Sequence, residues 1–361
     1  MKAAVENFLS GLSDLKGFLR NAERESALTA ILLRDDRFRL LSPDEQSLLS
    51  EISRAGTSKR QYLYAVAIVG LYGLLERLVD SVLESYVAEL SRSVRSYVEL
   101  PEAIRKNHLP ASIELLKAIN EERYRGDIQI PDVIANLHSC MTGSAGFQIN
   151  GTAFVLHRGN IKLDKVRGFL ASLGLDAANR KLLVMPSFDD FFSDADPPRD
   201  VRQVPDQDLD LLLSPIDDLV SRRNEIAHGV VDEIESVDLL LARGSFLAAF
   251  VHALHERLQM ELLPFKVAGD GTQALGQPIA IFGGSIACFE SATCRLAVGD
   301  SIVAVTEDTL MPYRWSEVQG LQVDRVDLPE LKLSEKTQFG VKVGFKVKDT
   351  HKFYVLKSST T

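Results

Sequence analysis

The chain has 361 residues, of which 45% are hydrophobic and 25% charged, and its formal net charge is −9. This composition is typical of a soluble globular protein and excludes a mainly disordered, collagen-like or low-complexity chain, and the length favours two domains over one. The net negative charge argues against bulk binding of duplex nucleic acid, which usually needs a broad basic face, but leaves a small RNA site open.

Membrane, disulfide and metal signals are weak. The longest apolar run extends from Ala65 to Leu75, which is too short to span a bilayer, and the N-terminus has no apolar core typical of a signal peptide. Cys140, Cys288 and Cys294 are an odd number of cysteines without CxxC spacing, so they predict neither a disulfide framework nor a zinc site. We therefore expect a cytoplasmic protein with no membrane contact, no metal and no cofactor.

The first 55 residues are predicted to be a helical segment. Leu9, Leu12, Leu15 and Phe18 recur at helical spacing. Residues 42–45 read Ser-Pro-Asp-Glu, which is typical of a helix start with Ser as N-cap, Pro at the first helical position and Glu three residues after the cap.

Residues 56–262 are predicted to form a helical domain. A long helix over residues 60–90 is apolar on almost every side, as in a helix buried from several directions. Further helices are expected over residues 161–173, 206–228 and 235–262. Residues 186–207 contain four aspartates but lack the order of a calcium loop, and we interpret them as a solvated polar loop.

After a Gly-rich linker at residues 263–275, the pattern changes to short alternating runs separated by turn residues. We predict five to seven short strands over residues 276–361, most simply as a small barrel. The fold class is thus α+β multidomain, a helical bundle followed by a small all-β domain.

The segment Ser-Arg-Arg-Asn-Glu-Ile-Ala-His-Gly, residues 221–229, contains the most informative set of polar residues. One interpretation is structural: His228 stabilises a helix C-terminus, and Arg222 and Arg223 are solvated or paired with nearby acids. The other is chemical, because an arginine, an adjacent Asn224 and a histidine near one helix end can act on a phosphate.

The order of the motifs favours the chemical interpretation. Arg-Asn-x-Ile-Ala-His-Gly at the end of a helix resembles the HEPN superfamily of helical ribonucleases. Upstream, the apolar helix at residues 71–87 carries Glu76, and residues 135–175 are similar to the middle of the RiboL-PSP-HEPN branch. The resemblance covers about residues 56–262 and implies a helical bundle and metal-independent RNA cleavage.

The resemblance assigns roles that fit the chemistry of these side chains. His228 would transfer protons near neutral pH, Arg223 would stabilise the charged phosphorane, and Asn224 would bind phosphate or orient His228. The expected products carry 2′,3′-cyclic phosphate and 5′-hydroxyl ends. Glu76 either pairs with Arg223 or makes an ordinary helix pair with Arg77 or Arg60.

Helix geometry raises a difficulty for a single chain. Five residues advance an α-helix by roughly 500°, so Arg223 and His228 lie about 140° apart. A distorted helix end or a second chain would solve this, and the family usually dimerises, so we expect a homodimer. Val230 replaces the tyrosine that accepts a nucleotide in some HEPN toxins, which argues against control by that modification.

The C-terminal domain offers a second surface. In residues 339–348, Lys342, Lys346 and Lys348 alternate with apolar residues, and an extended strand would place these lysines on one face. With Tyr354 nearby, the lysines either bind RNA together with Arg222 or protect an edge strand. The remaining histidines, His157 among them, are expected in core or surface roles.

The favoured hypothesis is a dimeric endoribonuclease acting on RNA, with tRNA as a candidate substrate, as a bacterial toxin or anti-phage effector with an antitoxin or sensor partner. The main alternative is a catalytically silent HEPN scaffold for dimerisation or partner binding. A purely structural helical protein with a chance motif is the third possibility.

Overall fold

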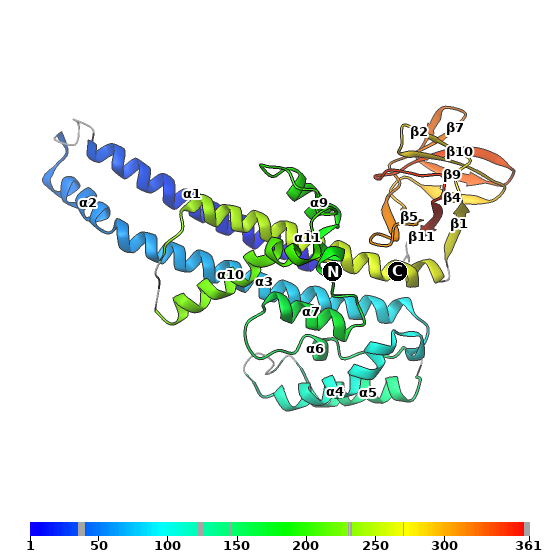
Figure 1. Cartoon of the computed structure of the whole chain (residues 1–361), viewed down its shortest axis with the longest axis horizontal. Helices are drawn as coiled ribbons and strands as arrows, with labels where there is room; N and C mark the ends of the chain where they lie inside the picture. Colours follow the sequence, from blue (N-terminus) through cyan, green and yellow to red (C-terminus); the bar gives the residue numbers. More distant parts are fainter. Residues whose placement is uncertain are drawn as a thin grey trace. The chain divides into compact units, whose positions relative to one another are not determined.

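The computed structural model describes residues 1–34, 40–121, 126, 128–144, 146–229, 231, 233–269 and 271–356. Helices precede strands along the chain (Figure 1), which confirms the predicted α+β class. The helices are α1 (Lys2–Arg34), α2 (Pro43–Arg54), α3 (Gly56–Ser93), η2 (Tyr97–Glu99), α4 (Glu102–Ala118), α5 (Ile130–Met141), α6 (Gly151–Phe154), α7 (Leu163–Ser172), α8 (Asn179–Leu183), α9 (Pro186–Ser193), η3 (Asp206–Asp208), α10 (Leu209–Ala227) and α11 (Val237–Ala268). The strands are β1 (Thr272–Gly276), β2 (Ala280–Phe282), β3 (Ile286–Ser291), β4 (Cys294–Ala297), β5 (Ser301–Val305), β6 (Tyr313–Glu317), β7 (Gly320–Val323), β8 (Val326–Leu328), β9 (Glu330–Leu333), β10 (Thr337–Lys342) and β11 (Lys352–Leu356).

The chain forms two compact units that divide three of its helices. The first unit contains Met1–Ser85, Lys106–Asp127 and Asn150–His255, and the second contains Tyr86–Arg105, Ile128–Ile149 and Glu256–Thr361. The divisions therefore fall inside α3, α4 and α11, whereas the predicted domain boundary followed residue 262. The residues of the Arg-Asn-x-x-x-His motif belong to the first unit.

Helix α1 packs closely against two other helices of the first unit. A Cβ atom on Gly11 would lie 2.6 Å from a methyl group of Leu74 in α3, and one on Gly244 of α11 would lie 3.0 Å from Leu12. The buried residues of α1 are Val5, Phe8, Leu12, Leu19 and Ala22. This stripe is rotated from the predicted one, since Phe18 is 47% exposed.

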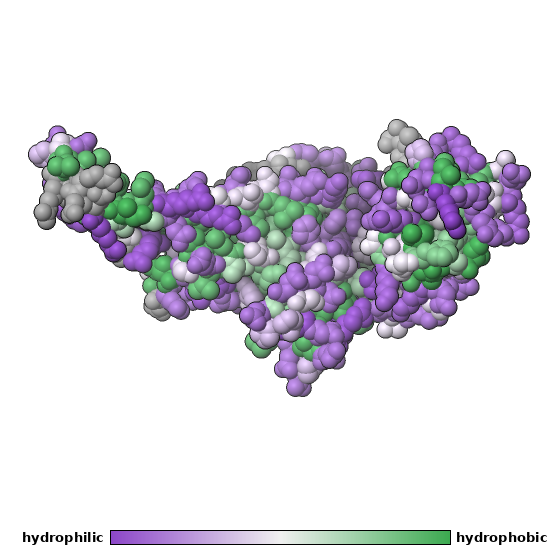
Figure 2. Space-filling view, turned by 90° about the horizontal axis from the view of Figure 1, so that it is seen from above, coloured by the Kyte–Doolittle hydropathy of each residue, from purple (hydrophilic) through white to green (hydrophobic). Residues whose placement is uncertain are grey.

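Helix α2 begins as the sequence predicts. The Ser42 side chain accepts from the backbone of Glu45, whose carboxylate in turn accepts from the Ser42 backbone N–H at 2.8 Å. Apolar side chains are exposed on both of these helices: Leu28 and Ile31 of α1 and Leu48 of α2 are 56%, 62% and 58% exposed. Figure 2 shows hydrophobic patches among hydrophilic ones at the end of the molecule where α1 and α2 lie.

Part of the expected polar loop is helical. Pro186 begins α9, and Phe188 and Phe192 lie one turn apart on its buried face. Phe188 contacts Phe246 and Phe250 of α11, with ring centroids 5.7 and 6.3 Å apart. The predicted loop was wrong here because aromatic packing outweighs the polar composition around these phenylalanines.

Helix α11 is the one described helix that is long and apolar enough to cross a membrane by length and hydropathy. Half of its most apolar stretch is buried inside the structure, and Phe250, Leu254 and Leu258 are fully buried. Core helices of soluble proteins meet the same criterion, so this helix alone is weak evidence for a membrane span.

The strands of the second unit form three antiparallel sheets, with orders β1-β11-β5-β6, β2-β3-β10-β7-β8 and β4-β9. Phe289, Phe339 and Phe353 lie at the centre of one shared core. The described residues contain eleven strands rather than the five to seven predicted, since several are only three or four residues long. Helix α11 ends at Ala268 and β1 begins at Thr272, so the connection is shorter than the predicted linker at 263–275.

Candidate functional site

The motif lies where the buried stripe of α10 ends. Leu209, Leu212, Leu213, Ile216, Leu219 and Val220 are the buried residues of this helix, at the spacing of a helix that packs on one side. Arg223 and Asn224 continue the same stripe by one turn and are half-buried. The helical period therefore directs these two polar side chains toward the bundle, and His228 lies beyond them at the exposed end.

Arg223 is held by an aromatic ring and an amide. Its guanidinium carbon lies 5.6 Å from the ring centroid of Tyr72 in α3, within the range of a cation–π interaction. Its Nη1 donates to Oδ1 of Asn224 at 3.4 Å. Among the described residues, no carboxylate forms an ion pair with Arg223, so its positive charge is available to a phosphate.

A loop at residues 157–161 lies between α3 and α10. The backbone N–H of Ile161 donates to the Tyr72 hydroxyl at 3.0 Å. Asn160 Nδ2 donates to Oδ1 of Asn224 at 2.7 Å. The loop therefore contacts Tyr72 of α3, whose ring lies beside Arg223, and it also contacts Asn224 of the motif.

His157 anchors the start of this loop. Its imidazole is fully buried, with Nδ1 2.7 Å from the carbonyl of Gly159 and Nε2 3.5 Å from Asp80 Oδ1 and 3.8 Å from Glu76 Oε1. Because a carbonyl only accepts, Nδ1 carries a proton. Nε2, on the other side of the ring, faces the carboxylates of Asp80 and Glu76.

Glu76 therefore has a different described partner from those proposed for it. The expectation offered Arg223, Arg77 or Arg60, whereas the structure places Glu76 beside His157, one helical turn from Tyr72 and Asp80 on α3. Glu76, at the end of the apolar stretch of this helix, did indicate a polar partner, whereas Asp80, one turn farther along, was not singled out. Nothing in the sequence identified His157 as that partner, because 77 or more residues separate them.

His228 caps the C-terminal end of α10. Its backbone N–H donates to the Asn224 carbonyl at 3.0 Å, which is the ordinary α-helical pairing, and its side chain is exposed. Gly229 follows with φ of +73°, a conformation that favours glycine and ends the helix. The helix thus remains regular as far as His228, so distortion does not bring His228 round to Arg223. Val230, whose identity argued against nucleotide modification, lies outside the described residues.

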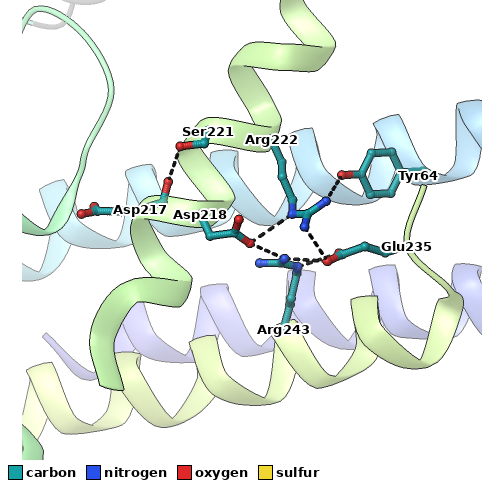
Figure 3. Close-up of polar contacts among 7 residues, drawn as sticks. All are labelled: Tyr64, Asp217, Asp218, Ser221, Arg222, Glu235 and Arg243. Atoms are coloured by element: carbon teal, nitrogen blue, oxygen red, sulfur yellow. Dashed lines mark hydrogen bonds and ion pairs between the residues drawn. The ribbon is translucent and has the colours of Figure 1, made fainter. Parts of the chain in front are cut away.

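Arg222 lies about 100° round the helix from Arg223. It joins an ion-pair cluster (Figure 3). It donates to Asp218 at 3.0 Å and to the Tyr64 hydroxyl at 3.1 Å, and its Nη2 lies 3.4 Å from Glu235. Arg243 of α11 donates to both Glu235 oxygens at 2.6 Å and also to Asp218. We call these residues, Tyr64, Asp218, Arg222, Glu235 and Arg243, the arginine cluster.

The arginine cluster changes the proton affinities of its members. Burial alone would raise the pKa of Asp218, but hydrogen bonds from Arg243 and Arg222 outweigh it and hold that pKa below its usual value. Burial likewise opposes the charged form of Arg222, yet its hydrogen bonds to Tyr64 and Asp218 raise its pKa overall. The donors of Arg222 are thus directed to protein acceptors, and its expected contact with RNA remains a prediction.

The three lysines of the second unit do not share one strand. Strand β10 ends at Lys342, and Lys346 and Lys348 lie in the following irregular segment. All three are exposed while Val343 and Val347 are buried, so burial still alternates. The predicted continuous strand was wrong, because Gly344 departs from the ladder and its N–H donates to the Ser316 hydroxyl at 3.0 Å.

Among the described residues, no group of three or more His, Cys, Asp or Glu side chains is arranged to hold a metal ion. The contacts described above define the candidate site. It consists of Arg223 and Asn224 of α10 with His228 at the end of that helix, of Tyr72, Glu76 and Asp80 of α3, and of the loop from His157 to Ile161. Sequence reasoning found the α10 residues and Glu76, and it missed the loop.

Comparison with known proteins identifies the family of the chain. A search of curated proteins finds no significant match. The RiboL-PSP-HEPN family matches residues 35–259, a range that includes every residue of the site and most of the helices described above. Because this match covers more than half of the chain, the protein belongs to the RiboL-PSP-HEPN family.

Proposed function

We propose that this protein is a metal-independent endoribonuclease that cleaves RNA to 2′,3′-cyclic phosphate and 5′-hydroxyl ends. HEPN domains are generally ribonucleases, so membership supports an RNA-related, nuclease-like function. We further propose that it acts in the cytoplasm as a toxin or anti-phage effector, with tRNA as a candidate substrate and an antitoxin or sensor as regulator.

The contrast between two adjacent arginines carries this proposal. Arg222 makes hydrogen bonds to Asp218 and Tyr64 within the arginine cluster. Arg223 lies over the Tyr72 ring beside Asn224, with no carboxylate partner among the described residues. A scaffold needs only the first kind of arginine. A charged guanidinium without an acid, next to an exposed His228, suits binding of a phosphate.

The proposed chemistry divides between these side chains. His228 moves a proton to or from the ribose hydroxyl or the leaving oxygen, and exposure leaves its imidazole accessible to RNA. Arg223 stabilises the negative charge that forms on the phosphorane. Asn224 donates from its amide to a phosphate oxygen. None of these steps uses a group beyond the chain and its substrate.

We propose that the active form is a homodimer. On a regular helix Arg223 and His228 lie about 140° apart, so His228 of a second copy can complete a site that one copy leaves divided. Tyr62, Val66 and Val69 follow one another at helical spacing on α3 and are 73%, 51% and 48% exposed. Gly73 continues this face with open space at its Cβ position. Such an apolar stripe is suited to the close packing of a second helix.

The exposed lysines Lys342, Lys346 and Lys348 remain the candidate RNA contacts of the second unit. Their charges would attract the phosphate backbone without reading its sequence. The contribution of these contacts would fall as salt concentration rises.

Expression of the wild type and of His228→Ala under tight induction tests the proposal. We expect RNA fragments with cyclic-phosphate ends from the wild type and none from His228→Ala. His138→Ala provides a matched control, because His138 is another exposed histidine near the end of a helix, α5, and this variant should cleave like the wild type. Equal fragments from His228→Ala would overturn the proposed chemistry. Intact RNA in every case would favour the silent scaffold.

A further inference from the structure

Asn160 fixes the orientation of an amide in the candidate active site. Its Nδ2 donates to Oδ1 of Asn224 at 2.7 Å, and Arg223 Nη1 donates to the same oxygen at 3.4 Å. Both neighbours are donors, so the atom between them must be the Asn224 oxygen. The Nδ2 amino group of Asn224 is then on the other side of the amide and can donate to a ligand.

The loop that carries Asn160 is fixed at both ends. His157 is fully buried, and its Nδ1 donates to the Gly159 carbonyl at 2.7 Å. Ile161 is also fully buried, and its backbone N–H donates to the Tyr72 hydroxyl at 3.0 Å. Asn160 therefore lies between two anchored residues, which restricts the positions its side chain can take.

We propose that Asn160 is a positioning residue for RNA cleavage: it holds the amide of Asn224 so that the amino group, and not the oxygen, faces the phosphate. This inference rests on the proposed ribonuclease function, since the amino group matters only where an anion binds. An oxygen in that place would repel a phosphate. Asn160 itself touches no reacting atom and acts through Asn224.

Two substitutions separate this role from simple packing. Asn160→Ala removes the donor and lets the Asn224 amide take either orientation. Asn160→Asp keeps the shape but replaces the donor with an acceptor, so the Asn224 amide should turn and donate to the new carboxylate. A packing role predicts that the near-isosteric aspartate is tolerated better than alanine. A positioning role predicts the reverse order for activity.

The expected effects on cleavage follow from the loss of one donor. We expect kcat/KM to fall about 3- to 10-fold in Asn160→Ala and roughly 10- to 100-fold in Asn160→Asp, toward the loss caused by Asn224→Ala. In the Asn224→Ala background, both Asn160 variants should change activity less than about 3-fold, because the group they orient is absent. A large further loss in that background would mean that the aspartate acts on Arg223 instead, and it would overturn the proposal.

A second readout does not depend on cleavage. The chain has nine asparagines, so selective ¹⁵N-asparagine labelling of the deuterated protein gives few side-chain amide signals, and Asn224→Ala identifies the signal of Asn224. We expect Asn160→Asp to shift the Asn224 amide protons downfield, because they then donate to a carboxylate, and to leave signals of distant asparagines such as Asn21 unchanged. An unchanged Asn224 signal would overturn the positioning role even where RNA is cleaved. A shifted signal in a protein that cleaves no RNA would support the orientation of the amide and reject the ribonuclease function alone.

Discussion

Removing one charge from the arginine cluster should weaken the helical unit measurably. Glu235 is the acid most enclosed there: its side chain is 8% exposed, and Arg243 donates to both of its oxygens at 2.6 Å. Glu235→Gln keeps the shape and one acceptor, but leaves Arg222 and Arg243 with Asp218 as their only acid among the described residues of the cluster. The cluster then changes from neutral to a net charge of +1.

The size of the effect follows from the contacts that are lost. One charge-assisted hydrogen bond contributes about 1.5–3 kcal/mol, and breaking a fully buried ion pair costs about 3–5 kcal/mol. The Asp218 side chain is 44% exposed, so solvent and Asp218 offset part of the loss. We expect Glu235→Gln to lower the free energy of unfolding by about 2–3 kcal/mol.

Urea unfolding measured by far-ultraviolet circular dichroism reports on the helices. The single tryptophan, Trp315, lies in β6, so its fluorescence provides a separate measure of the strands. Glu233→Gln is the matched control, because it removes the same charge from an exposed residue two positions away, and it should change stability by less than about 0.5 kcal/mol.

A double-mutant cycle between Glu235→Gln and Arg243→Gln should give a coupling energy of about 1–3 kcal/mol. Equal shifts from the Glu233 and Glu235 variants would refute the reasoning, because they would show that the helical unit responds only to overall charge. An absent coupling would show that the short contacts in the cluster contribute no net stability.

Three other substitutions test separate parts of the structure. Arg223→Lys should lower the cleavage rate about 10- to 100-fold, because lysine cannot hold a phosphate with two donors, while urea stability stays within about 0.5 kcal/mol; an equally active variant would contradict the proposed role. Val66→Glu with Val69→Glu should give a monomer by light scattering that does not cleave RNA, whereas an unchanged mass would place the dimer elsewhere. Burial lowers the pKa of His108 to about 4, and its Nε2 accepts from the Asn150 N–H at 3.1 Å. The unfolded chain binds this proton near pH 6.5 and the folded chain only near pH 4, so this residue should lower stability by about 3 kcal/mol as pH falls between those values. His108→Gln should remove that part of the pH dependence in urea titrations, and an unchanged slope would contradict it.

Periodicity predicted the long elements correctly because their packing repeats with every turn. The helix at residues 60–90, the helix ending at His228 and the cap at Ser42 are all present. Helix α9 was missed because three phenylalanines in a polar segment become informative only when they contact α11. The lysine-bearing segment ended early for a similar reason, since a contact between Gly344 and Ser316 competes with the strand ladder.

The candidate site was predictable only as far as it is contiguous in sequence. Arg223, Asn224 and His228 lie within six positions, so one motif contains them. The loop that orients Asn224 lies 64 residues earlier, and no local pattern connects an asparagine with a second asparagine at that distance. Glu76 came nearest to indicating it, because a carboxylate at the end of an apolar stretch of helix is costly without a polar partner. The partner is a buried histidine of that loop.

The opposite surroundings of Arg222 and Arg223 follow from the geometry of α10. Adjacent residues on an α-helix differ by roughly 100° in direction, so Arg222 faces α11, Glu235 and Tyr64 of α3, while Arg223 faces Tyr72, farther along α3. The buried stripe of α10 determines which is which, because it positions residue 223 toward the Tyr72 ring. The same helix therefore supplies one arginine whose charge is balanced by acids and one whose charge is available to a phosphate. In this arrangement the arginine cluster ties Glu235 to α10 and α11, so stability and chemistry depend on neighbouring residues with separate partners.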